Sequence, residues 1–498
     1  MSLASLTMTI PPLPLGINTA RPKAFQIMPV ELNQKIAHYL DNDKDLVSFR
    51  ACCRQARDSV DDQDSFWHRR FRMTYDLSRD KAHKPGNSLS LRRSYQKRKN
   101  LMRDGISFSK GTTRKEKEVI ALIIDMFRES YEGGAFPDEN DLATCNNLEA
   151  IWRFAKRTNL LDVLFMTGKD DKSGKIDFRL NQDFVAVQLM LAPMVLDCDD
   201  YKRPYNFIES QRIAYTDYGH STIWKNNTIE LDLEYLLHLG NFFKHHMVGD
   251  DMTLRDPMQD LDLAQRPQFW KAPLTNTPKK LGNRWMGTYA YLDRDEMAEL
   301  RSGNPNRALF MDKNVDHGES AIQSLVIDFD SLPEFEWPEL FEQILKSQTL
   351  PPPAHSHAQH RSTAGQDEDS RCDNEGLKSY QFQAYGYDDE DFLATGWINQ
   401  LPAQRGIPGW QRISMIKYFR DDSNDGGFDA NALWAYEGIV LPGGQIILGR
   451  WWSPDDDIRD HEKYTGPFIF WNVDASTDPL VGMEEYEEAL RKKAAEAQ

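Results

Sequence analysis

The stretch that decides the N-terminal architecture is residues 28–54, MPVELNQKIAHYLDNDKDLVSFRACCR. Pro29 stands where a helix begins, a position at which the missing N–H of proline costs little. The apolar residues after it recur at helical spacing and form one stripe, made of Leu32, Ile36, Tyr39 and Leu40. The acidic turn that follows breaks this helix, so the sequence predicts a short amphipathic helix here.

Two further short helices are predicted after that turn. Leu46, Phe49 and Cys53 share one face of the second helix, and Phe66-Trp67 opens the third after a polar turn. Three short helices in fewer than fifty residues build only a small core, which is marginally stable alone. We therefore expect the stability of this unit to depend on contacts with a partner or with the rest of the chain.

The ordered set of these elements resembles an F-box. That family's pattern has an apolar-Pro pair, an acidic-apolar pair, a Tyr-Leu helix end, an Asp-Leu helix start, a Cys-Arg segment and a terminal Trp, and residues 28–67 match each in order. Met28 departs from the usual Leu. The resemblance implies a non-catalytic substrate-recognition subunit of a Skp1–cullin–F-box ubiquitin ligase. The residues implied to make or shape the Skp1-binding surface are Met28, Pro29, Leu32, Ile36, Leu40, Leu46 and Trp67.

Composition and periodicity divide the rest of the chain. Basic residues dominate one stretch, helical spacing the next, and alternating aromatic and β-branched residues the C-terminal half, where Leu441-Pro442-Gly443-Gly444 signals a turn. The predicted fold class is α+β multidomain, with a three-helix F-box, a mostly α-helical middle region and a C-terminal antiparallel β-barrel or sandwich. The predicted parts are a flexible tail 1–24, the F-box 25–72, a basic linker 73–118, the helical middle region 119–280, a β-barrel-like domain 281–475 with a disordered insert 347–376, and a C-terminal helix or tail 476–498.

A second, looser resemblance covers the β domain. Residues 284–291, RWMGTYAY, look like the opening strand of the β-barrel found behind F-boxes in many fungal proteins. That barrel ends in W-x-Y-x-G, G-x-W and G-P-F-x-x-W strands, matched here at 434–438, 449–451 and 466–471. It is similar to the lipocalin-like domain of animal and plant F-box relatives. The resemblance implies that the β domain holds a target protein.

Several side chains of the β domain are candidates for binding that target. Aromatics in small barrels usually fill the core, and the alternative is that some line an open mouth. The guanidinium of Arg450 is expected either to bind a target carboxylate through two hydrogen bonds or to form a surface salt bridge. The candidates are Trp285, Tyr289, Trp434, Tyr436, Arg450 and Trp451. An alternative function is a barrel that binds a small ligand or peptide and uses the F-box only for Skp1-linked assembly.

Charge and composition exclude other classes of protein. The 498 residues carry a net charge of −17, which opposes general nucleic-acid binding, and no apolar run is long enough to cross a membrane. Five cysteines without a CxxC pair favour a reducing compartment, the cytoplasm or the nucleus. The acidic run 388–391 is expected to be a solvated turn. His238, His245 and His246 lack accompanying ligands, so no metal, cofactor or catalytic residue is predicted.

Overall fold

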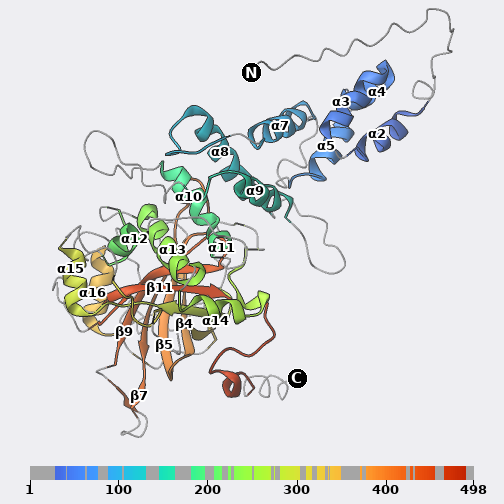
Figure 1. Cartoon of the computed structure of the whole chain (residues 1–498). Helices are drawn as coiled ribbons and strands as arrows, with labels where there is room; N and C mark the ends of the chain where they lie inside the picture. The colour runs from blue at the N-terminus through green and yellow to red at the C-terminus, as the bar shows by residue number, and fades with distance from the viewer. Residues whose placement is uncertain are drawn as a thin grey trace, which may run out of the picture. The chain divides into compact units, whose positions relative to one another are not determined.

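The computed structural model divides the chain into two compact units (Figure 1). One comprises Met1–Thr74 and His83–Lys97, and the other Tyr75–Ala82 and Arg98–Gln498. The predicted tail 1–24 and residues 349–370 and 373–376 of the predicted insert lie outside the described residues. The structure describes residues 28–40, 42–61, 64–76, 88–103, 106–130, 145–162, 181–196, 207–215, 223–225, 229–249, 252–270, 274, 281–302, 310–316, 322–330, 335, 337–348, 371–372, 377–421, 427–429, 432–454 and 465–488.

The first unit is helical. Its helices are α2 (Val30–His38), α3 (Asp43–Cys52), α4 (Arg54–Asp61), α5 (Asp64–Arg72) and the first part of α7 (Ser88–Leu101). The second predicted helix is divided in two, because the backbone of Cys53 is extended, with φ −162° and ψ 166°. Asn42 caps α3 by accepting a hydrogen bond from the Lys44 backbone N–H at 3.0 Å. Four helices therefore stand between residues 30 and 72, where the sequence predicts three.

Helices dominate the second unit up to residue 260, as predicted for the middle region. They are α8 (Arg114–Glu129), α9 (Asn146–Arg157), α10 (Gln182–Met190), α11 (Ala192–Val195), α12 (Phe207–Ala214), α13 (Leu233–Val248) and α14 (Arg255–Asp260). A capping box of Thr113 and Glu116 starts α8. The segment predicted as a basic linker includes α7 and this first turn, and its Arg98 is buried in an ion pair with Glu129.

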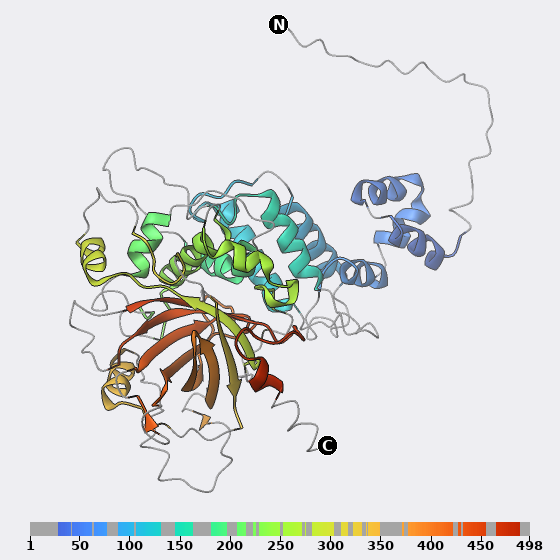
Figure 2. The same cartoon turned by 60° about the horizontal axis from the view of Figure 1, so that its bottom comes forward.

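The C-terminal half is a closed, antiparallel barrel of eight strands. Each barrel strand pairs with the next one in the sequence, including β2 (Gln323–Asp328) with β4 (Lys378–Asp388), where Val326 lies opposite Tyr385. The last strand returns to the first, with Thr288 opposite Ile469. This is an up-and-down barrel, so of the two predicted forms the barrel is confirmed (Figure 2). The strands are β1 (Arg284–Tyr289), β2 (Gln323–Asp328), β4 (Lys378–Asp388), β5 (Glu390–Gln400), β6 (Gln411–Tyr418), β9 (Trp434–Val440), β10 (Ile446–Trp452) and β11 (Thr465–Asn472).

Short elements border the barrel. β3 (Arg371–Cys372) pairs with β4, and β7 (Arg420–Asp421) pairs with β8 (Gly427–Phe428). A single 3-10 turn, η2 (Leu263–Gln265), follows α14, and helix α15 (Arg294–Arg301) follows β1. Helix α16 (Glu339–Gln348) places Phe341 and Leu345 in an apolar cluster with outward-facing side chains of β5 and β6.

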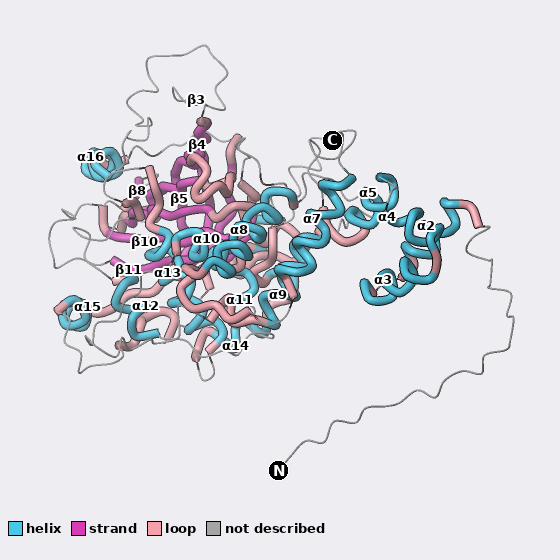
Figure 3. The backbone as a smooth tube through the Cα atoms, turned by 90° about the horizontal axis from the view of Figure 1, so that it is seen from above, coloured by secondary structure: helices cyan, strands magenta, loops and turns pink. Residues whose placement is uncertain are grey.

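Helix α13 packs on the outside of β10 and β11 (Figure 3). A Cβ at Gly240 of α13 would lie 3.7 Å from the Leu448 side chain, so the helix and the strand are in ordinary contact. Interior-facing side chains fill the barrel, and Trp285, Phe382, Phe468 and Phe470 belong to one buried cluster. The barrel core is therefore packed from inside and covered by helices outside.

Candidate functional site

The predicted apolar stripe of α2 faces solvent. Leu32 is 49% exposed, Tyr39 at the C-cap is 76% exposed, and Ile36 between them is half-buried. The opposite side of the helix is buried, and it holds Asn33 and Ala37. The helix thus turns its most apolar side away from its own domain, a distribution typical of a face covered by a partner.

Polar contacts explain the orientation of this helix. The Asn33 and Gln55 side chains both donate to the Met28 carbonyl, at 3.4 and 3.0 Å. The Gln34 side chain donates to the Ser59 carbonyl at 3.1 Å. His38 is buried and stacks on Phe66 with ring centroids 4.5 Å apart. These bonds hold the polar side of α2 against α4 and α5, and leave the stripe outside.

The predicted Skp1-binding residues divide into exposed and buried groups. Pro29 is exposed, whereas Met28 and Leu40 are half-buried. Leu46 and Trp67 are each 4% exposed and belong to the core. The predicted Skp1-binding set leaves out three exposed apolar side chains: Tyr39 of the stripe, Val47, which is 59% exposed on α3, and Met73, which follows α5.

Trp67 joins α5 to α7 inside the first unit. Its ring lies 5.3 Å from Phe66 and 5.7 Å from Tyr95, and the Arg92 guanidinium lies 5.4 Å from the ring centre. Tyr95 donates to Asp43 at 2.9 Å, and burial raises the pKa of this phenol. The fifth helix therefore completes the small core that the sequence predicts to be marginal.

The predicted target-binding aromatics lie mainly inside the barrel. Trp285, Tyr436 and Trp451 are buried in its core, and Tyr289 and Trp434 are partly buried against it. The rings of Trp434 and Trp451 meet edge-on at 5.3 Å. The structure brings five of the six candidates together as interior packing.

Arg450 precedes the inward-facing Trp451 on β10, so its side chain lies on the outer side of the barrel, and it is also buried. It lies opposite Glu437, which forms a buried ion pair with Arg412. The Trp224 indole N–H donates to the same Glu437 at 3.1 Å. Arg450 therefore belongs to a buried polar layer between the barrel and the helical region, and a solvent-exposed salt bridge, one of its two predicted roles, is ruled out.

The acidic run 388–391 is only partly a solvated turn. Asp388 is buried and forms an ion pair with Lys417, which is also buried in the barrel. The Lys417 ammonium lies 4.2 Å from the Phe392 ring and 5.1 Å from the Phe419 ring. Asp388 departs from the prediction because it sits at an inward-facing position of β4, opposite a cation from β6.

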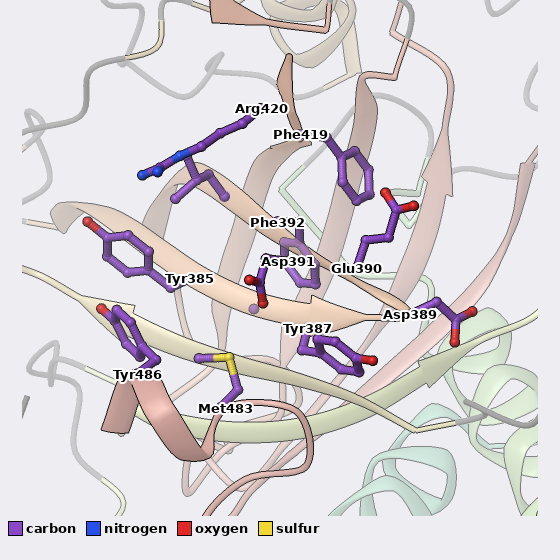
Figure 4. Close-up of a pocket in the computed structure, with 12 residues that line it drawn as sticks. Tyr385, Tyr387, Asp389, Glu390, Asp391, Phe392, Phe419, Arg420, Met483 and Tyr486 are labelled. Atoms are coloured by element: carbon purple, nitrogen blue, oxygen red, sulfur yellow. The ribbon is translucent and has the colours of Figure 1, made fainter. Parts of the chain in front are cut away.

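A cavity of about 720 Å³ lies beside this run, at the turn from β4 to β5. Tyr385 and Tyr486 stand side by side at one end, with ring centroids 4.8 Å apart (Figure 4). Asp389, with φ 58°, forms the tip of the turn, and Asp391 and Arg420 also line the cavity. Sequence reasoning missed this site because its walls come from segments about a hundred residues apart.

One group among the described residues has the composition of a metal site. His246, Asp312 and Asp316 place their ligand atoms within 4.8 Å of one another. However, the two ring nitrogens of His246 each face a carboxylate, Asp312 at 3.1 Å and Asp316 at 3.2 Å. Tyr215 and Gln211 both donate to Asp312 at 2.7 Å. This arrangement fits a protonated imidazole held by two carboxylates.

Comparison with known families identifies one part of the chain. A family model described as F-box-like matches residues 25–73, which cover α2 to α5. No curated protein and no solved structure matches the chain. Within the part that the structure describes, no helix is both long and apolar enough to cross a membrane. The N-terminal resemblance is thus confirmed, and residues 25–73 form an F-box-like domain.

Proposed function

We propose that this protein is the substrate-recognition subunit of a Skp1–cullin–F-box ubiquitin ligase. Its F-box-like domain binds Skp1, and its β domain binds a target protein. The observation that carries the proposal is the outward-facing stripe of α2 in the matched segment 25–73.

The exposed stripe provides a physical reason for binding. Burying a whole leucine side chain is worth about 1.5–3 kcal/mol. Leu32 is half exposed, so covering it yields about 1 kcal/mol, and Tyr39 and Val47 expose still larger fractions. A few such residues at the centre of an interface are enough to dominate its affinity.

The proposed mechanism requires no chemistry from this chain. Skp1 connects the F-box to a cullin scaffold, and the β domain holds a target near a ubiquitin-charged enzyme on that scaffold. Tethering raises the effective concentration of the target lysine at the reacting thioester. The proposed partners are therefore Skp1, through it a cullin, and a target protein.

The alternative function predicted from the sequence is a β-barrel that binds a small ligand or peptide and uses the F-box only for Skp1-linked assembly. The barrel interior offers it little support, because its aromatic side chains pack on one another. Tyr436 meets Phe468 at 5.0 Å, and Phe468 meets Phe470 at 5.6 Å between ring centroids. Recognition at the surface of the β domain is the better supported mode.

Co-purification of the full chain with Skp1 tests the proposal. Leu32→Asp places a charge on the exposed stripe of α2, and Val47→Asp places one at an exposed apolar position of α3. We expect each change to abolish retention of Skp1 while the thermal melting temperature stays within about 2 °C. Asp45→Ala is the matched control, because Asp45 lies about 200° around α3 from Val47. Retention of Skp1 by both charged variants, or failure of the intact chain to retain it, would refute the proposal.

Target recognition requires a separate experiment. Proximity labelling under proteasome inhibition compares the intact chain with the Val47→Asp variant in cells. Proteins that are labelled by both but are ubiquitylated only with the intact chain are candidate targets. If no labelled protein changes its ubiquitylation between the two, the chain is not a recognition subunit.

A further inference from the structure

The cavity at the β4–β5 turn has walls that are fixed in place. The segment before Tyr486 packs on the barrel so closely that a Cβ at Gly482 would lie 2.2 Å from the Tyr387 ring. Ser324 donates to the Val481 carbonyl at 2.9 Å. Arg284 of β1 pairs with the buried Glu487 at 2.7 Å. Tyr486 is therefore held as a wall of the cavity, and the site is pre-organised.

Aromatic rings form the apolar part of this site. Tyr385, Tyr387 and Tyr486 are half-buried around it, and Phe419 and Phe392 line its other end (Figure 4). Burial is the main factor that raises the pKa of the Tyr486 phenol well above its ordinary value, so the phenol is neutral. Neutral aromatic faces attract cations through their quadrupoles.

The charges around the cavity favour the same kind of guest. Asp389, Glu390 and Asp391 line it and are exposed, and among its lining residues Arg420 is the cation. Carboxylates next to aromatic rings provide both a charge-assisted hydrogen bond and a stacking face for a guanidinium. The volume of about 720 Å³ is within the range of pockets that hold a side chain and its neighbours.

We propose that this cavity binds an arginine- or lysine-bearing segment of a target protein. The cationic side chain lies between the tyrosine rings and meets the carboxylates of the β4–β5 turn, and flanking apolar residues contact Met483 and Phe419. This inference deepens the proposed function, on which it rests, by naming the chemical class of the target segment. A free polyamine shares the cationic chemistry, but it lacks the flanking apolar groups that would use the ring-lined ends.

Ligand-observed saturation-transfer NMR on the full chain tests the site. The probe is the capped peptide Leu-Arg-Leu, and its control is Leu-citrulline-Leu, which has nearly the same shape without the charge. We expect saturable binding of the arginine peptide, and at least about tenfold weaker binding of the citrulline peptide. Equal binding of the two peptides, or binding of neither, would overturn the proposal.

Variants then locate the binding. We expect the double variant Glu390→Gln, Asp391→Asn to raise the Kd about three- to tenfold, and Tyr486→Ala to raise it by a similar factor. Asp295→Asn, an exposed carboxylate on α15 outside the cavity lining, is the matched control and should leave the Kd unchanged. An effect of Asp295→Asn as large as that of the turn variant would show diffuse attraction to the acidic chain and overturn the site.

A substitution at Arg420 tests whether the bound group is cationic or anionic. Because it repels a cationic guest, Arg420→Gln is expected to lower the Kd of the arginine peptide about two- to threefold. Loss of binding in this variant would show that Arg420 grips an anionic group, which contradicts the proposal. Spermidine that binds as tightly as the peptide, with no effect of Tyr486→Ala, would likewise refute a protein segment as the occupant.

The two proposals fail in different ways. Retention of Skp1 is measured for the same cavity variants, and we expect it to be unchanged. If the intact chain fails to retain Skp1 but binds the arginine peptide, the ligase assignment is wrong and the site stands. If Skp1 is retained but the peptide does not bind, the site is wrong and the adaptor assignment stands.

Discussion

The buried His246 predicts a specific dependence of stability on pH. Its side chain is 1% exposed, and its ring nitrogens lie 3.1 Å from Asp312 and 3.2 Å from Asp316. Burial favours the neutral ring, but the hydrogen bonds and charges of the two carboxylates outweigh it and raise the pKa of His246 to about 9. The ring is therefore protonated in the folded protein at neutral pH.

The direction and size of the effect follow from linkage. The pKa of an unfolded histidine is about 6.5, so the folded chain binds the proton more tightly. This stabilisation is fully present below about pH 6.5 and is lost as the pH rises through about 9. At 1.36 kcal/mol per pKa unit, the difference between the folded and unfolded pKa values of His246 corresponds to about 3 kcal/mol of unfolding free energy.

Urea unfolding of the full chain and of His246→Gln at pH 6, 7.5, 9 and 10 measures this contribution. The glutamine variant lacks the titrating ring, and groups remote from the cluster titrate alike in both proteins, so their contributions cancel in the difference. We expect that difference in unfolding free energy to fall by about 3 kcal/mol between pH 6.5 and 10. A difference that does not change with pH would refute the ion-pair interpretation. A wild-type stability that rises with pH only when Zn²⁺ is added would assign the cluster to a metal instead.

Three other substitutions test the packing of the two units. Trp67→Ala is expected to cost the first unit about 3–5 kcal/mol in urea unfolding, and a cost below about 1 kcal/mol would contradict its placement in the core. Lys417→Met is expected to lower the unfolding free energy by about 3–5 kcal/mol, because it leaves the Asp388 carboxylate buried without a counter-charge. The double variant Lys417→Met, Asp388→Leu should recover most of that loss, and an equal loss in the single and double variants would refute the pairing. Gly443→Ala, at φ +97° against the Trp270 side chain, is expected to lower the melting temperature more than Gly406→Ala, at φ +76° in open space. An equal loss in the two variants would show that the contact with Trp270 adds nothing to the cost of the positive φ.

Sequence periodicity predicted helix α2 correctly but gave no information on which side is buried. Leu32, Ile36 and Tyr39 form the apolar stripe, and a stripe normally faces the core. In the structure Asn33 and Ala37 face the core instead. Hydrogen bonds that fix this orientation, such as the one from the Gln34 side chain of α2 to the Ser59 carbonyl of α4, join residues from different helices, and no local pattern encodes them.

The acidic run 388–391 shows the same limit. Its composition is typical of a turn, and Asp389 does form the turn. Asp388 nevertheless lies at an inward position of β4, where burial of its charge depends on Lys417 from β6. A single strand does not reveal that partner, because a buried carboxylate is stable only when a distant segment supplies the opposite charge.

Local sequence patterns were enough to predict the F-box-like segment, the helical middle region and the alternation of the β strands, because each depends on neighbours within a few residues. Only the tertiary structure shows that the strands close into a barrel, with Thr288 of the first strand opposite Ile469 of the last. It also decided that the target-binding candidates lie mostly in the barrel core, and that Tyr385 and Tyr486 meet at a cavity. Closure, burial and cavity walls depend on contacts between distant segments, and those contacts exist only once the chain has folded.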